Sequence, residues 1–368
     1  MKKAMLFACI EKNIGDDLFV YLVCKRYKNV DFYISDEAKY GSLEKISNLH
    51  FSKLIRIWTT LTKVSKNNIV KYWIARTVCI IIGLFIPKYE YGVYIVGNAF
   101  KNTNYRDSSQ ISWLIHRIKK VNRFYILSTN FGPYKSNKWV ADCKKVFAMA
   151  EDVCFRDNKS FELFSNQLGN VRYAPDAVLS LGIQKKHDPK LNHKKRVLIT
   201  VVRYPNGSLD DKKRYIDRLA SIVTYFIDLS ISVSILNSNA DQDMTVTSEV
   251  IKKVKSSKGI DIINYDGNLE KIKELYNSTD YVIGTRLHTI ILAWLYNIPV
   301  FPIVYDVKVA NIINDYGFSS GKCSIEDFCY LKNEDIYASL MNYDFQLSTQ
   351  VLEKAKTQFM KLDEAFLN

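Results

Sequence analysis

The residues best suited to chemistry in this chain lie in the stretch 280–317. Arg286 and His288 stand where an apolar strand gives way to an apolar helix, and Lys308 follows the next apolar strand. The first turn of a helix carries free N–H groups and the positive end of the helix dipole, which favour a bound anion. These residues therefore predict a phosphate or carboxylate site. A surface ion pair with a structural histidine is the alternative, and spacing alone does not choose between the two.

The elements around these residues alternate between strand and helix. Runs of apolar residues predict strands at 281–283 and 300–305, with helices at 287–297 and up to Gly317. This alternation is typical of a parallel α/β sheet, in which ligands bind outside the carboxyl ends of the strands. Further strands complete a doubly wound sheet in the second half: 197–202, 231–236 and 260–264.

The first half repeats the alternation, with small or polar residues after its strands. Gly97 follows one strand and lets a ligand approach the backbone closely. Asn130 lies in a loop, 129–134, whose polar and aromatic groups suit a sugar ring. Asp16 opens the first helix, either as a capping carboxylate or as a functional group. The expected strands are 4–10, 31–35, 91–96, 124–128 and 153–155.

Length and composition fit a folded protein of two domains. The chain has 368 residues, of which 48% are hydrophobic and 24% charged. We expect an N-terminal domain at 1–183 on the acceptor side, a linker at 184–195, a C-terminal domain at 196–325 and a helical tail at 326–368. The seven cysteines are scattered and never spaced CxxC, which indicates reduced cytoplasmic thiols and no metal site.

The net charge of +14 is unevenly distributed. Between Glu44 and Glu90 there is no Asp or Glu, and basic residues are interleaved with Trp, Leu and Ile. The window 45–88 suits helices on an anionic membrane face; a solvated basic face of ordinary core helices is the alternative. No stretch reaches the roughly 18–20 apolar residues of a membrane span. No nucleic-acid-binding signature is present, so no nucleic-acid partner is expected.

Several short motifs occur in an order that resembles the polysaccharide pyruvyl transferase family. They are Asn-x-Gly-Asp (Asn13, Gly15, Asp16), Arg-Asp-x-x-Ser after a strand (Arg156, Asp157, Ser160), Pro-Asp (Pro175, Asp176) and Arg-x-His opening a helix (Arg286, His288), followed by Pro299 and Lys308. The family often has a run of glycines where this chain has Gly97, Asn98 and Ala99.

The resemblance implies two Rossmann-like domains facing a cleft in a GT-B-like arrangement. It implies transfer of the enolpyruvyl group of phosphoenolpyruvate onto a sugar diol as a cyclic ketal, in capsule, exopolysaccharide or cell-wall glycan biosynthesis. Phosphoenolpyruvate is then a co-substrate, with no other cofactor and no metal. The acceptor is a sugar, with a lipid-linked oligosaccharide as one option, and the location is the cytoplasm, with the inner face of the cell membrane as an option.

Phosphoenolpyruvate carries two anionic groups, which favours two clamps. We expect Arg286 and the Leu287 backbone N–H to bind one group, Arg156 from the other domain to bind the second, and Lys308 to assist. His288 is the candidate acid or base, and Asp16 the candidate to orient or deprotonate the acceptor. The remaining expected substrate contacts are Asn13, Gly15, Gly97 and Asn130.

Two alternatives stay open. A glycosyltransferase that uses a sugar nucleotide would have the same scaffold, although no acidic ribose ligand is evident in the second half. A non-catalytic, membrane-associated scaffold would use the basic window and would tolerate loss of His288.

Overall fold

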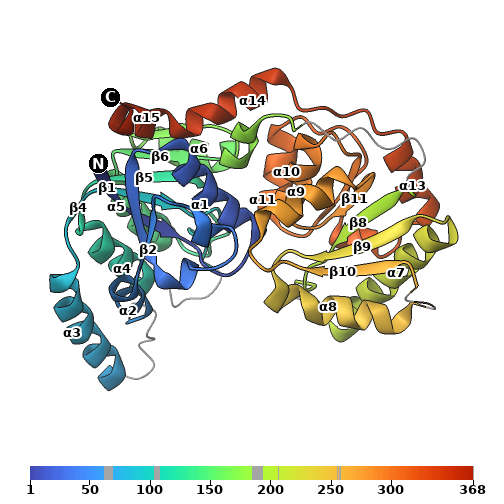
Figure 1. Ribbon diagram of the computed structural model, residues 1–368, viewed down its shortest axis with the longest axis horizontal. Coiled ribbons are helices and arrows are strands. Elements are labelled where there is room, and N and C mark those ends of the chain that lie inside the picture. The colour runs from blue at the N-terminus through green and yellow to red at the C-terminus, as the bar shows by residue number, and fades with distance from the viewer. Residues whose placement is uncertain are drawn as a thin grey trace. The chain divides into compact units, whose positions relative to one another are not determined.

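The computed structural model describes residues 1–61, 69–102, 108–184, 194–205, 207–254, 256 and 258–367, without the side chains of 108–110 and 113. The chain forms two compact units (Figure 1). Unit 1 comprises Met1–Ile10, Asp16–Ala177 and Lys354–Asn368, and unit 2 comprises Glu11–Gly15 and Val178–Glu353. The division thus falls between Ala177 and Val178. Most of the expected linker, 185–193, lies outside the described residues.

Unit 1 is built on a seven-stranded parallel sheet with the order β3-β2-β1-β4-β5-β6-β7. The strands expected in the first half are confirmed, and β3 and β7 are additional. The chain order reverses between β1 and β4. The strand bounds are β1 Lys2–Ala8, β2 Val30–Ser35, β3 Leu49–Ser52, β4 Tyr89–Ile95, β5 Val121–Thr129, β6 Asp152–Phe155 and β7 Val171–Tyr173.

Helices and aromatic side chains complete the core of unit 1. The Phe147 ring packs edge-on against Phe100 and Phe164, with ring centroids 4.8 and 4.9 Å away. Such edge-to-face contacts add to the stabilisation from burial. The helices are α1 Ile14–Arg26, α2 Lys53–Leu61, α3 Ile69–Phe85, α4 Ser108–Ile118, α5 Asn137–Ala148 and α6 Asn158–Ser165.

Unit 2 contains a six-stranded parallel sheet with the order β10-β9-β8-β11-β12-β13. The strands predicted for the second half are confirmed, and the order reverses between β8 and β11. The bounds are β8 Arg196–Thr200, β9 Ser232–Asn237, β10 Ile260–Asn264, β11 Tyr281–Gly284, β12 Val300–Val304 and β13 Cys323–Ser324.

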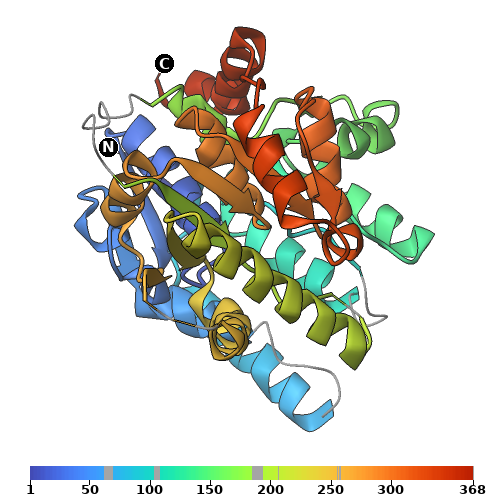
Figure 2. The ribbon, with the colours of Figure 1, turned by 90° about the vertical axis from the view of Figure 1, so that its right-hand side faces the viewer.

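The helices of unit 2 cover both faces of this sheet. The longest, α7, is the yellow-green helix in Figure 2, and it packs on β9 through an apolar stripe that includes Leu219, Val223 and Phe226. The helices are α7 Leu209–Asp228, α8 Ala240–Lys253, α9 Leu269–Asn277, α10 Leu287–Leu295, α11 Val307–Asp315, α12 Ile325–Phe328 and α13 Asn333–Met341.

The C-terminal tail is helical, and its last part belongs to unit 1. It contains α14 Thr349–Lys356 and α15 Met360–Phe366. Arg26 donates two hydrogen bonds to Asp363, at 2.7 and 2.6 Å. The Phe366 ring packs edge-on against the ring of Tyr91, 4.9 Å away. The segment from Lys354 onward is therefore part of the core of unit 1.

Candidate functional site

The turn that carries Arg286 and His288 lies at the point where the strand order of unit 2 reverses. Three threonines hold it. The Thr285 N–H donates to Oγ1 of Thr200 at 2.9 Å, and the Thr285 hydroxyl donates to the Thr200 carbonyl at 2.9 Å. The Thr289 hydroxyl donates to the Arg286 carbonyl at 2.6 Å. The turn is thereby fixed at the position where parallel α/β sheets bind ligands.

Arg286 is the N-cap residue of α10, and its guanidinium is largely buried, with 17% of the side chain exposed. Its Nη2 donates to the fully buried Asp243 and, at 3.5 Å, to Gln242. Burial lowers the pKa of Arg286, while Asp243 and Tyr305 raise it by more, so the group stays charged. The Nε–H is buried without an acceptor among the described residues. Arg286 is therefore held in place by Asp243, and its Nε–H is left without an acceptor among the described residues.

His288 lies against the segment Glu11–Gly15, which packs with unit 2. A Cβ on Gly15 would stand 1.8 Å from Nδ1 of His288, so only glycine leaves room for the imidazole. The Gly15 N–H donates to Oδ1 of Asn13 at 2.9 Å, and Asn13 pairs with Asn239 in an isolated β-bridge. The backbone of Asn239 in turn donates to Asp243 at 3.0 Å.

Four of the predicted residues thus come together in unit 2. Asn13 and Gly15 join Arg286 and His288 through the chain of contacts just described, although they are far apart in sequence. Asp16 follows Gly15 directly and is half-buried in the first turn of α1, but it belongs to unit 1.

Lys308 lies in the first turn of α11, after β12. Strands β11 and β12 pair in parallel with Gly284 opposite Pro302, so Arg286 and Lys308 follow strand ends at the same edge of the sheet. The Lys308 Nζ is 3.6 Å from Asp306 and 5.9 Å from the centre of the Tyr305 ring, with 15% of the side chain exposed. Leu287, the first residue of α10, is buried.

The Arg-Asp-x-x-Ser and Pro-Asp motifs meet in unit 1, around a buried arginine. Arg156 donates to Asp176 at 2.7 Å, to the Gly97 carbonyl at 2.9 Å and to Oδ1 of Asn130 at 2.9 Å. Arg156 is 2% exposed and Asp176 is fully buried. These bonds tie together the loops after β4, β5 and β6. Substrate contact by Arg156, Asn130 and Gly97 stays a prediction, because the contacts described are internal to the protein.

The rest of the Arg-Asp-x-x-Ser motif also has a local role. Asp157 caps α6 by accepting from the Ser160 N–H at 3.0 Å, and the Ser160 hydroxyl donates to Asp157 at 2.7 Å. Oγ of Ser160 accepts from the Phe131 N–H at 2.8 Å. The motif therefore fixes the loop that the sequence indicates as a sugar-binding candidate.

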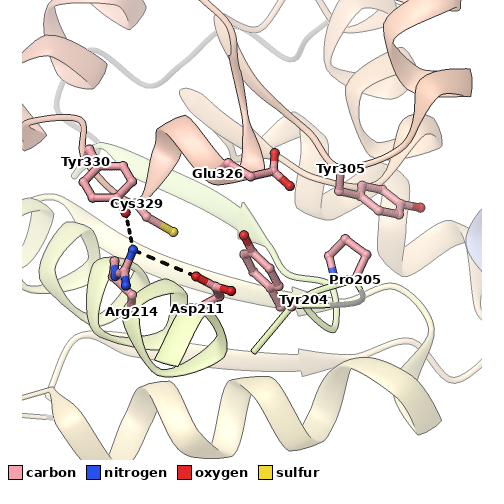
Figure 3. A pocket seen from close by; sticks show the side chains of 9 residues that line it. Tyr204, Pro205, Asp211, Arg214, Tyr305, Glu326, Cys329 and Tyr330 are labelled. Carbon is pink, nitrogen blue, oxygen red and sulfur yellow. Dashed lines mark hydrogen bonds and ion pairs between the residues drawn. The ribbon is translucent and has the colours of Figure 1, made fainter. Parts of the chain in front are cut away.

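A pocket of about 570 Å³ lies in unit 2 beside Tyr305 (Figure 3). Figure 3 shows Tyr204, Asp211 and Arg214 on one side and Glu326 and Tyr330 on the other. Arg214 lies 3.9 Å from Asp211 and 5.4 Å from the centre of the Tyr330 ring. Because Tyr305 also raises the pKa of Arg286, the pocket and the Arg286 turn share this tyrosine.

Sequence reasoning missed several of these residues. Asp243 lies a few residues after Asn237, Ser238 and Asn239, which stand at the end of a strand. Polar residues at a strand end are only a weak signal for a ligand-binding position. The threonines at 200, 285 and 289 give no signal, because their role comes from contacts across strands. The pocket residues are contributed by three separate segments, and nothing in local spacing predicts that they meet.

None of the seven cysteines forms a disulfide. Within the described part of the chain, no group of three or more His, Cys, Asp or Glu residues is arranged to hold a metal ion. In the same part of the chain, no helix is both long and apolar enough to cross a membrane.

Solved structures that resemble this chain show its fold. The chain aligns over 100% of its length with 98% of S. aureus MnaA solved with UDP, with a TM-score of 0.58 and 11% identity. It aligns over 99% of its length with all of the UDP-GlcNAc 2-epimerases from Methanocaldococcus jannaschii (TM-score 0.58, 10% identity) and Neisseria meningitidis (TM-score 0.56, 13% identity). The protein therefore has the GT-B fold, as predicted.

The family follows from the sequence itself. The model of the polysaccharide pyruvyl transferase family matches residues 13–307, which include every motif discussed above up to Pro299. The chain belongs to this family and is a transferase, which confirms the resemblance and argues against a non-catalytic scaffold. A search of curated proteins finds no match.

Proposed function

We propose that the protein transfers the enolpyruvyl group of phosphoenolpyruvate onto a sugar diol as a cyclic ketal. The observation that carries this proposal is the Arg286 turn. A buried, charged guanidinium with a spare Nε–H lies at the mouth of α10 and at the strand reversal of unit 2, two residues before His288. That arrangement suits a small anion with an acid or base beside it.

In this proposal one anionic group of phosphoenolpyruvate binds Arg286 and the first N–H groups of α10, with Lys308 assisting. His288 protonates the methylene carbon, which becomes a methyl group, and a sugar hydroxyl attacks the neighbouring carbon. The C–O bond to phosphate then breaks, and a second hydroxyl attacks to close the ketal. One hydroxyl proton ends on the methyl carbon and the other leaves with inorganic phosphate, so the step balances.

Asp16 and Arg156 remain proposed participants from unit 1. Asp16 directly follows Gly15, and it would orient or deprotonate the acceptor hydroxyl. Arg156 would hold the second anionic group only if it released one of its internal partners, and its more direct role is to order the loops of unit 1. No other cofactor is invoked.

We propose that the acceptor sugar binds in the tyrosine-lined pocket of unit 2, which differs from the acceptor side in the N-terminal domain expected from the sequence. Tyr204, Tyr305 and Tyr330 offer aromatic faces, while Asp211 and Glu326 offer acceptors for sugar hydroxyls. Arg214 is balanced by Asp211, and Glu326 adds a negative charge, so the pocket suits a neutral ring better than a phosphate. We further propose that the acceptor belongs to a capsule, exopolysaccharide or cell-wall glycan and is presented at the cytoplasmic face of the membrane.

The decisive assay is phosphate release from phosphoenolpyruvate with and without free or lipid-linked oligosaccharides. We expect acceptor-dependent release that Arg286→Ala and His288→Ala abolish. The matched control is Arg196→Ala. Arg196 is the first residue of β8, so it lies at the amino ends of the strands, away from the Arg286 turn, and it donates to the Ser278 hydroxyl at 3.0 Å. Thermal stabilisation by a sugar nucleotide and none by phosphoenolpyruvate would replace the proposal with a glycosyltransferase.

The acceptor pocket has a separate test. Tyr330 is 70% exposed, so Tyr330→Ala should fold normally and raise the KM for the acceptor about tenfold, through loss of one ring contact. Binding of phosphoenolpyruvate should not change. Tyr134→Ala removes a 41%-exposed ring from the rival sugar-binding loop in unit 1. If only Tyr134→Ala raised the acceptor KM, the acceptor would bind in unit 1.

A further inference from the structure

Helix α3 in unit 1 buries Tyr72 and three small residues, while most of its large apolar residues are exposed. The residues it turns toward the protein include Ala75, Cys79 and Gly83. A Cβ on Gly83 would lie 3.4 Å from the Trp58 indole, and the Cys79 thiol donates to the Trp58 carbonyl at 3.8 Å. A helix that packs only on protein normally buries its bulky side chains and exposes polar ones.

The outward face of α3 is instead bulky and apolar. The exposed apolar residues recur at spacings of one and four positions, near the start of the helix and again near its end. Such spacings place them along one side of α3. Scattered exposed apolar residues need no explanation, but a contiguous patch marks an interaction surface. The six most exposed members, each between 56% and 76%, are Ile69, Val70, Trp73, Ile74, Leu84 and Phe85.

Cations border this apolar face. Lys71 and Arg76 are exposed on α3, and the Arg76 guanidinium lies 5.2 Å from the centre of the Trp73 ring. Lys53 and Lys88, beside the two ends of the α2–α3 region, are also exposed. No acidic residue occurs between Glu44 and Glu90. The face therefore combines exposed apolar surface with a local excess of basic over acidic residues in the sequence.

The neighbouring part of α4 extends the positive field. Burial lowers the pKa of His116, and Lys120, Lys119, Arg76 and Arg117 lower it further. Lys120 lies along α3, since its Cε is 3.6 Å from the Cβ position of Gly83. Figures 1 and 2 both show α3 at the outer edge of unit 1, projecting beyond its sheet.

We propose that this α3 face, Ile69–Phe85 with its flanking lysines and arginines, docks on an anionic lipid bilayer. Apolar side chains and a tryptophan enter the headgroup region, while the cations pair with lipid phosphates. A protein partner of this chemistry would need a complementary acidic and apolar surface. An anionic bilayer supplies both properties over any area, and among the described residues no helix is long and apolar enough to cross it. This inference does not depend on the reaction of unit 2.

The test is co-sedimentation of the full chain with vesicles of pure phosphatidylcholine or with phosphatidylglycerol added at one third. We expect binding to the anionic vesicles that weakens with salt. Lys71→Glu with Arg76→Glu should weaken it by at least about 25-fold, at about fivefold per charge. Trp73→Glu with Leu84→Glu should abolish it. Leu209→Glu is the matched control, because Leu209 is an 83%-exposed apolar residue of unit 2.

A second readout reports insertion directly. Among the tryptophans with described side chains, Trp58, Trp139 and Trp294 are buried and Trp73 is 56% exposed. Brominated lipids should therefore quench emission in the wild type and much less in Trp73→Phe. Unchanged urea midpoints would show that the variants fold. Equal binding by wild type and the glutamate variants would overturn the proposal. The proposal would also be overturned if the wild type formed a dimer and bound no vesicles, and if the glutamate variants were monomeric.

Discussion

At the residue scale, the contact between Gly15 and His288 links the N-terminal motif to the candidate acid. Gly15→Ala would place a methyl group 1.8 Å from the present position of Nδ1, so the imidazole must move. A displacement of this size at a reacting group costs about 100-fold in turnover. We expect that loss in the phosphate-release assay, together with a nearly unchanged urea midpoint.

The control for this substitution is Gly169→Ala, since a Cβ at Gly169 meets no atom within 4 Å. The double variant Gly15→Ala/His288→Ala should be no less active than His288→Ala alone, because both changes act through one side chain. Wild-type turnover in Gly15→Ala would show that the imidazole position is unimportant.

Arg156 gives a second prediction at this scale, and here the readout is stability. Arg156→Ala removes the cation that pairs with the buried Asp176 carboxylate, which should lower the free energy of unfolding by about 3–5 kcal/mol. The control is Lys138→Ala, which breaks an exposed pair with Asp142 at 2.8 Å and should cost less than about 1 kcal/mol. Loss of activity with full stability in Arg156→Ala would instead support direct substrate binding.

At the scale of elements, the start of α7 depends on a carboxylate. Ser208 and Asp211 form a capping box, in which each side chain accepts from the backbone N–H of the other. Hydrogen bonds from the Ser208 side chain and backbone lower the pKa of Asp211. A lowered pKa in the folded state means that the stabilisation is present at neutral pH and is lost as the pH falls through that pKa.

We therefore expect Asp211→Ala to lower the urea midpoint at pH 7, and the difference from wild type to shrink on acidification. Asp210→Ala is the matched control, because Asp210 lies in the same first turn and is not part of the capping box. A difference that stayed constant with pH would mean that packing, rather than the charged cap, accounts for the effect.

The elements themselves were largely predictable from sequence, for a physical reason. Strand β10 was predicted with its observed bounds, 260–264, and helix α10 with its observed start at Leu287. Apolar runs and their breaks are local properties. The short edge strands β3 and β7 were missed, since a run of three or four residues carries too little periodicity to be recognised.

The candidate site was predictable only in part. Arg286 and His288 were found because a strand end and a helix start are visible in one stretch. Asp243, which holds Arg286, lies 43 residues away, and its role depends on how β9 and β11 are placed in the sheet. The exposure of the α3 face could not be predicted either. The same apolar sequence fits a buried helix, and only the packing shows which side chains remain outside.

At the scale of the whole molecule, unit 1 depends on the end of the chain. Deletion of 354–368 removes Phe359, Leu362 and Phe366, all buried, whose burial contributes about 5 kcal/mol or more. It also leaves Ser128 N–H without Gln358, which accepts from it at 3.0 Å. We expect hydrogen exchange to accelerate throughout unit 1 and to remain slow in the core of unit 2.

Leu367→Ser is the control for this truncation, because Leu367 is 63% exposed and its change should leave exchange in unit 1 as it was. If the truncated chain exchanged like the full one in unit 1, the tail would be an accessory and not part of the core.

The return of the tail to unit 1 also sets the order in which a ribosome can complete this protein. Nearly all of unit 1 is synthesised first, and unit 2 has all of its residues once Glu353 has emerged. Unit 1 receives Phe359, Leu362 and Phe366 only after that, so the apolar surface around Tyr27 and Tyr91 stays open during most of translation. The half of the protein that is made first is therefore the half that is finished last.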